Sequence, residues 1–131
     1  MDKPKIISFP RSRDRDAWLS VAENGRIPFE IRRVFYLSGF EKDSIRGEHA
    51  HKSSRQLLVA LSGTIEVSLE DISGRLFEFI LDQEHKALYI PPLYWGKMIF
   101  EKGSIALALA SDNFSEDDYI RDYEEFKSMD P

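Results

Sequence analysis

The sequence contains no cysteine and no apolar run long enough to cross a bilayer. Its first residues show no basic segment followed by an apolar run, so we expect no secretory signal and predict a cytoplasmic protein. Positive charge is also scarce, because 18 Lys and Arg stand against 23 Asp and Glu, which gives a net charge of −5. This balance argues against general binding to nucleic acid or to an anionic membrane, although a local cluster of Arg could still bind an anionic small ligand.

The remaining composition is that of one folded domain spanning residues 1–131, with 42% hydrophobic and 31% charged residues. Short alternating runs are broken by Gly, Pro, Asn and Asp, which predicts an antiparallel all-β domain. Thr64–Glu70 is the clearest run, with Ile65, Val67 and Leu69 predicted to face inward. Roughly ten strands suggest a barrel. The predicted strands are Ile6–Phe9, Trp18–Ala22, Ile31–Ser38, Ile45–His51, Gln56–Leu61, Thr64–Glu70, Leu76–Leu81, Ala87–Ile90, Lys97–Phe100 and Ser104–Ala110.

A short helix is predicted near the C-terminus. Ser115 could cap it with Asp118 at the third helical position, and Tyr119, Tyr123 and Phe126 would form its apolar stripe. The acidic residues 116–118 would complement the helix dipole, so we expect them to serve the structure rather than the chemistry.

The most informative segment is Arg46-Gly47-Glu48-His49-Ala50-His51-Lys52. Alternate spacing on a strand points His49 and His51 to the same face, and the small Ala50 packs on the opposite face. A lone histidine is more often structural, but two imidazoles that converge on one pocket are suited to moving protons near neutral pH.

The histidine pair, together with Gln56 and Gly63 downstream, resembles the first motif of the cupin barrels. Metal-binding cupins use three histidines and one carboxylate, whereas here Gln56 replaces the carboxylate and Gly96, after Pro91-Pro92, replaces the last histidine. Two histidines with an amide bind a transition metal weakly, so we predict a site without metal.

Other candidates are less clear from the residues alone. Arg33 shares a strand face with Phe35, and Arg32 shares the other face with Tyr36, but the sequence does not reveal which face is inside. Arg in a barrel mouth would bind a diphosphate well, and a solvated Arg is the alternative. Trp95 could stack on a base or sugar or could pack in the core, and Lys97 could bind phosphate or lie in solvent. His85 is expected at the surface.

Five segments in order resemble the sugar 3,4-ketoisomerases, small cupins that act on dTDP-4-keto-6-deoxyglucose in bacterial deoxysugar pathways. The resemblance covers nearly the whole chain. The segments are Pro28-Phe29-Glu30-Ile31-Arg32-Arg33-Val34-Phe35-Tyr36, Arg46-Gly47-Glu48-His49-Ala50-His51-Lys52, Tyr89-Ile90-Pro91-Pro92-Leu93-Tyr94-Trp95, Ala110-Ser111-Asp112 and Asp118-Tyr119-Ile120-Arg121.

This resemblance implies a homodimer of β-barrels with no metal or organic cofactor. It also implies a dTDP-linked 4-keto-6-deoxy sugar as substrate, in a pathway to deoxyamino sugars of surface polysaccharide. It carries the catalytic roles onto His49 and His51, and Tyr36 matches the family's active-site tyrosine. We add Arg46 to the predicted catalytic residues, and the predicted substrate-binding residues are Arg33, Lys52, Gln56, Trp95 and Lys97. Some relatives carry histidine where this chain has Gly96, so the configuration of the product at C4 stays open.

The expected reaction moves a carbonyl from C4 to C3 through an enediolate. One histidine, with His49 favoured, would remove the C3 proton, the other would carry protons at the oxygens, and Tyr36 and Arg46 would steady the oxyanion. Three rivals remain: a metal-dependent cupin with an unidentified third ligand, a sugar-nucleotide 3,5-epimerase, and a non-catalytic sugar-binding or regulatory cupin.

Overall fold

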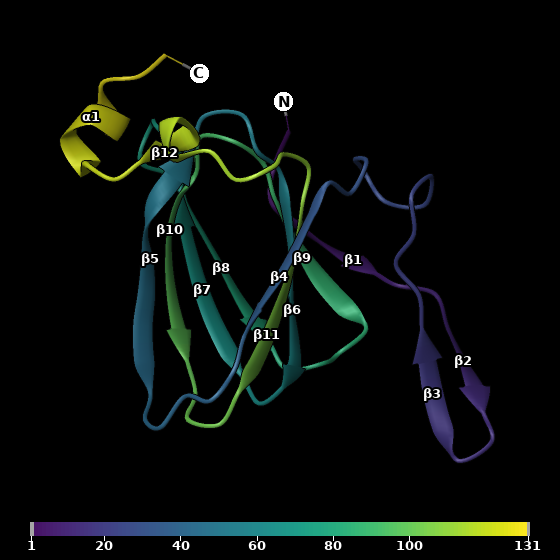
Figure 1. Cartoon of the computed structure of the whole chain (residues 1–131). Helices are drawn as coiled ribbons and strands as arrows, with labels where there is room; N and C mark the ends of the chain where they lie inside the picture. The colour runs from purple at the N-terminus through teal and green to yellow at the C-terminus, as the bar shows by residue number, and fades with distance from the viewer. Residues whose placement is uncertain (1, 131) are drawn as a thin grey trace.

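The computed structural model describes residues 2–130, which fold mainly into antiparallel β-strands (Figure 1). Two five-stranded sheets face each other and form a barrel, which confirms the all-β prediction. The first sheet contains, in spatial order, β1 (Lys5–Ser8), β9 (Lys86–Ile90), β6 (Gln56–Ser62), β11 (Ile105–Ala110) and β4 (Arg33–Leu37). The second contains β12 (Tyr119–Ile120), β5 (Ser44–His51), β10 (Trp95–Phe100), β7 (Ile65–Glu70) and β8 (Leu76–Leu81).

Alternation along the strands sends one set of side chains into the space between the sheets. On β7, Ile65, Val67 and Leu69 are buried as predicted, because every second residue points to the same face. The first sheet is buried on its outer face as well, where Phe9 and Phe29 cover it. Residues 57–60 of β6 are therefore all buried and read as a continuous apolar run rather than an alternating one.

A two-stranded hairpin, β2 (Arg11–Asp14) with β3 (Ala17–Ser20), stands apart from the barrel (Figure 1). The sequence predicted a strand at Trp18–Ala22 but not β2, because the charged residues of β2 have no apolar alternation. All four residues of β2 are exposed, and Arg11 and Arg13 stack on the ring of Trp18.

The C-terminal segment corrects the predicted helix. Ser115 makes no side-chain cap, and residues 116–118 form a single 3₁₀ turn, η1 (Glu116–Asp118), that leads into β12. The α-helix, α1 (Tyr123–Lys127), begins later, where the Asp122 carboxylate accepts a hydrogen bond from the Glu124 amide. Phe126 is fully buried against Ala50 and Ile120, so the short helix does dock on the barrel.

Candidate active site

A bulge in β5 sets the direction of the two histidines. In the pairing of β5 with β10, His49 lies opposite Gly96 and Gly47 lies opposite Lys97, so Glu48 is the extra residue. Gly47 and Glu48 both have positive φ, 94° and 58°. Beyond the bulge the alternation resumes, Ala50 packs beneath α1, and His49 and His51 share the other face.

The two imidazoles lie edge to face, with ring centroids 5.1 Å apart and an interplanar angle of 86°. Tyr119 lies against both, 5.1 Å from the His49 ring and 4.5 Å from the His51 ring. His49 lines a cavity of about 400 Å³, and His51, 8% exposed, lies beside the cavity behind Tyr119 and Gln56. The cavity is lined by Phe35, Leu37, Arg46, Gly47, His49, Gln56, Leu58, Met98, Phe100, Ala108, Tyr119 and Arg121.

His49 is suited to act as a base. Its Nδ1 lies 3.2 Å from the Gly47 carbonyl oxygen, which can only accept, so Nδ1 carries the proton and Nε2 keeps its lone pair. Burial, followed by the charge of His51, lowers the pKa of His49 below 6.5, and these effects outweigh the Gly47 hydrogen bond. The imidazole is therefore neutral at pH 7.

His51 is held by a carboxylate from 67 positions further along the chain. Its Nδ1 lies 2.8 Å from Oδ2 of Asp118, and both side chains are about nine-tenths buried. Burial raises the pKa of Asp118, but the hydrogen bonds from His51 and Ser53 outweigh it, so this pKa lies below 3.8. The expectation that residues 116–118 serve only a helix terminus is wrong for Asp118.

Of the predicted arginines, Arg46 lines the cavity and Arg33 stacks on a residue that lines it. The guanidinium of Arg46 lies 5.4 Å from the Phe40 ring centroid. Phe35 faces inward, so Arg33 shares the inner face and stacks on the Phe35 ring at 4.3 Å. The sequence left this choice of faces open. Arg32 lies outside, near Glu30.

Tyr36 does not belong to this cavity. It occupies the outer face of β4 and is 70% exposed, because Phe35 and Leu37 on either side of it line the cavity. Tyr36 therefore lies outside this cavity of the single chain, and its catalytic role stays a prediction. The tyrosine that lines the cavity is Tyr119, from β12.

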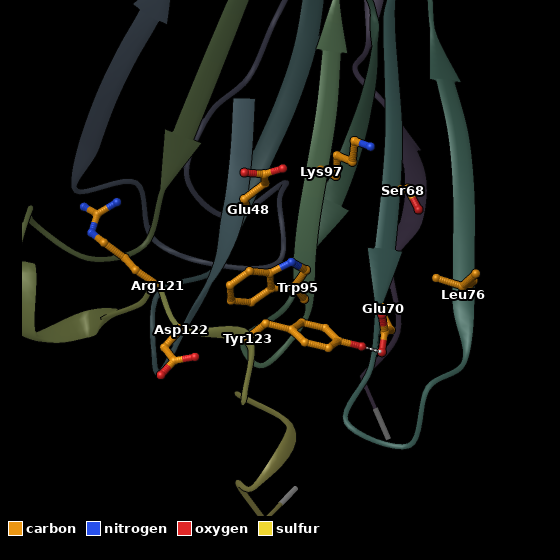
Figure 2. A pocket seen from close by; sticks show the side chains of 9 residues that line it. All are labelled: Glu48, Ser68, Glu70, Leu76, Trp95, Lys97, Arg121, Asp122 and Tyr123. Carbon is orange, nitrogen blue, oxygen red and sulfur yellow. Dashed lines mark hydrogen bonds between the residues drawn. The ribbon is translucent and has the colours of Figure 1, made fainter. Parts of the chain in front are cut away.

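Trp95 and Lys97 are likewise on the outside of the barrel, so they do not line the cavity that holds His49, and their role in substrate binding stays a prediction. Gly96 and Met98 occupy the inward positions of β10, so the alternate residues Trp95 and Lys97 face outward. Both line a groove of about 600 Å³ on the outer face, and Figure 2 shows Trp95 beside Tyr123. The Trp95 ring packs on Tyr123 and on Phe126, which favours the packing role.

Of the two remaining predicted residues, Gln56 lies at the cavity and Lys52 lies outside it. Gln56 lines the cavity, with its amide nitrogen 3.4 Å from His51 Nε2. Lys52 follows β5 with an exposed side chain, and its backbone amide donates to the Asp118 carbonyl.

Sequence reasoning missed three residues of the site: Asp118, Tyr119 and Arg121. Arg121 lines the cavity and the outer groove, stacks on Tyr119 at 4.4 Å and pairs with Glu116. The segment Asp118-Tyr119-Ile120-Arg121 supported the family resemblance, but its helical interpretation hid the pairing of Tyr119 with His51.

Within residues 2–130 no three His, Asp or Glu side chains are grouped so as to hold a metal ion. Over the same range, no helix has the length and apolar character needed to span a membrane. The donor set at the site is two imidazoles and an amide, one imidazole being bound to Asp118, which is a poor fit to the metal sites of cupins.

Known proteins share both the sequence and the fold. A TDP-4-oxo-6-deoxy-α-D-glucose-3,4-oxoisomerase from Aneurinibacillus thermoaerophilus is 39% identical over 125 residues, which are 94% of this chain and 89% of that protein. The structure of WlaRA, a TDP-fucose-3,4-ketoisomerase from Campylobacter jejuni, is 34% identical with a TM-score of 0.89, over 96% of this chain and 94% of that one. QdtA, a sugar 3,4-ketoisomerase from Thermoanaerobacterium thermosaccharolyticum solved with TDP, is 35% identical with a TM-score of 0.87, over 95% and 91%.

A dTDP-4-dehydrorhamnose 3,5-epimerase from Bacillus anthracis is a more distant neighbour, 16% identical with a TM-score of 0.76 over 88% of this chain and 76% of that one, and shares the fold alone. The ketoisomerase neighbours confirm the predicted cupin-like fold. The family described as FdtA, WxcM-like, C-terminal matches residues 2–130. With that match and these relatives, the chain belongs to the FdtA family of sugar 3,4-ketoisomerases.

Proposed function

We propose that this protein is an isomerase that converts dTDP-4-keto-6-deoxyglucose into a dTDP-3-keto-6-deoxyhexose of galacto or gluco configuration. The observation that carries the proposal is the position of His49, whose imidazole lines a cavity beside His51 in a chain of this family. The 3,4-oxoisomerase and ketoisomerase relatives support the substrate class.

The reaction needs only proton transfers. The C4 carbonyl acidifies the C3 hydrogen, and His49 Nε2 removes that proton to give an enediolate. The O3 hydroxyl then loses its proton, O4 gains one, and C4 receives a hydrogen, so the carbonyl ends at C3 with no net oxidation. His51 is the second proton carrier, and the guanidinium of Arg46 stabilises the oxyanion as charge develops.

Substrate binding is assigned to Arg33, Arg46 and Gln56, with Lys52 at the edge of the site. A planar guanidinium pairs well with a diphosphate, and the Gln56 amide can donate to a sugar oxygen. The cavity volume of about 400 Å³ suits a hexose better than a whole nucleotide sugar, so the nucleotide would extend out of the cavity.

We further propose a homodimer. Support comes from exposed apolar surface outside the barrel: Val34 and Tyr36 on edge strand β4 are 58% and 70% exposed, and Trp18 and Leu19 on the projecting hairpin are 47% and 52% exposed. Apolar surface of this kind usually marks contact with another protein. Size-exclusion chromatography coupled to light scattering should give twice the mass of the chain. The mass of a single chain would contradict this proposal.

The cytoplasm is the proposed location, on the basis of the cysteine-free sequence. The proposed product carries a ketone, so a following transamination would give a deoxyamino sugar for surface polysaccharide. Fractionation of cells with an antibody to the protein would test the location.

The function is tested with chelator-treated protein and dTDP-4-keto-6-deoxyglucose, with the product identified by carbon NMR. A 3-keto product formed at the same rate after metal removal supports the proposal. Loss of turnover that returns with one metal would support the metal-dependent cupin instead, and binding without turnover would support the sugar-binding cupin.

A further inference from the structure

Asp118 is fixed to β5 by its backbone as well as by its side chain. It is the last residue of η1, and its carbonyl oxygen accepts from the Lys52 amide at 2.8 Å. The next residue, Tyr119, pairs with His51 in the β12–β5 ladder. The carboxylate is therefore held beside His51 although 67 positions separate them in the chain.

The two carboxylate oxygens have different partners. Oδ2 accepts from His51 Nδ1 at 2.8 Å, and Oδ1 accepts from the Ser53 backbone amide at 2.7 Å. The Ser53 hydroxyl lies 3.0 Å from Oδ1 of Asp118 and 2.7 Å from Oδ2 of Asp112. Its single proton can be donated to only one of these two carboxylates at a time. The fixed donors of Asp118 are thus His51 Nδ1 on Oδ2, and on Oδ1 the Ser53 amide together with the Ser54 amide at 3.4 Å.

This arrangement determines the tautomer of His51. An ionised carboxylate can only accept, so Nδ1 must carry a proton, and in the neutral ring Nε2 then keeps the lone pair. Nε2 is directed to the amide nitrogen of Gln56, a group that lines the cavity. A basic nitrogen is thereby presented on the cavity side of the ring.

We infer that Asp118 is a positioning residue, which holds His51 in the tautomer with Nδ1 protonated and Nε2 basic. The kinetic test of this inference rests on the proposed ketoisomerase activity. The spectroscopic test does not. The charged or titratable groups around this pair are His49 from β5, Tyr119 from β12 with Arg121 stacked on its ring, and Asp112 across Ser53. Asp112 touches Ser53 and not His51, so the orientation of the ring depends on Asp118.

The substitution Asp118→Asn removes the negative charge of the carboxylate but keeps the size and shape of the side chain. Because the Ser53 amide is a fixed donor, the new amide must give it the oxygen and turn the NH₂ group towards His51. His51 would then have to accept at Nδ1 and carry its proton on Nε2. The same exchange in the serine-protease triad lowers kcat about 10⁴-fold, so we expect a loss of about 10²–10⁴-fold in kcat with KM changed less than about threefold.

The matched control is Asp117→Asn, which makes the same chemical change on the neighbouring, exposed residue of η1. We expect it to keep the parental kcat and KM. Asp118→Glu keeps the acceptor and should recover part of the activity that Asp118→Asn loses. Melting temperatures of all three variants check that each one folds.

The direct readout is nitrogen NMR of ¹⁵N-histidine-labelled protein at neutral pH, with His51 assigned by comparison with His51→Asn. The parent should show His51 protonated at Nδ1 only, and Asp118→Asn should show it protonated at Nε2. A parent protein with His51 protonated at Nε2, or an Asp118→Asn variant with an unchanged tautomer and full kcat, overturns the inference. If the parent has no turnover, the proposed function fails while the tautomer measurement still decides the role of Asp118.

Discussion

A Cβ atom added to Gly47 would lie 2.8 Å from the carbonyl oxygen of Gly96, the residue opposite His49 on the neighbouring strand. This close approach of two backbones fixes the bulge that turns Glu48 outward and His49 inward. The direction of the His49 imidazole thus depends on two residues without side chains.

The first prediction concerns that contact. Gly47→Ala combines a positive φ of 94° with a clash against backbone, so we expect it to destabilise the fold by about 2–4 kcal/mol and to misalign His49. Gly103→Ala is the matched control, because Gly103 also has positive φ, 77°, but a Cβ there meets no atom within 4 Å. It should cost only about 1 kcal/mol and leave kcat unchanged. Thermal denaturation and turnover measure both, and equal effects of the two substitutions would contradict this account of the bulge.

The second prediction concerns the two histidines. His49→Asn and His51→Asn each remove a proton carrier and should lower kcat by about 10²-fold or more. His85→Asn is the control, since His85 lies in the turn before β9, away from the cavity residues. Near-normal kcat in both site variants would refute the proposed mechanism.

The third prediction is the dependence on pH. The folded-state pKa of His49 lies below its unfolded value of 6.5, so kcat/KM should stay on its plateau below pH 6.5 and then fall as His49 takes up a proton. For the same reason the unfolded chain binds this proton first, and stability decreases as the pH falls from 6.5 towards the folded pKa. Asp118 adds a second loss at lower pH, because its depressed pKa favours the folded state above 3.8 and this advantage disappears as the carboxylate protonates.

The check is denaturant unfolding of the parent and of His49→Asn between pH 7 and pH 5. The decrease in stability over this range should be smaller in His49→Asn. An identical decrease in both proteins would show that His49 does not titrate as described.

The fourth prediction distinguishes the inside of the barrel from its outside. Arg46→Met removes a cation that lines the cavity and should lower kcat/KM at least about 10-fold. Lys97→Met removes a cation from the outer groove and should change kcat/KM less than about twofold. Steady-state kinetics of the two variants measure this difference, and a larger loss in Lys97→Met would return Lys97 to the substrate site.

The sequence predicted what depends on local periodicity. Alternation on β7 gave the buried face of Ile65, Val67 and Leu69, and the His-x-His spacing gave the shared face of His49 and His51. Both patterns lie within a single strand and needed no knowledge of its neighbours.

The sequence did not predict what depends on another part of the chain. Alternation separates Phe35 from Tyr36 and Gly96 from Trp95, but which of each pair faces inward is decided by the packing of the two sheets. Asp118 stands three residues after Ser115, which is the spacing of a helix cap and its third helical residue. Only the pairing of β12 with β5 brings Asp118 to His51, to which it binds instead. A contact across 67 positions has no local signal in one sequence.

The central claim is that protons move at C3 and C4 of the sugar while the carbonyl migrates. Its most direct test is to incubate the metal-stripped protein with dTDP-4-keto-6-deoxyglucose in deuterated water and to read the product by NMR. The account predicts a 3-keto sugar with deuterium at C4, and the coupling constants would also give its configuration. Deuterium at C5 with the ketone still at C4 would indicate an epimerase and would contradict the account.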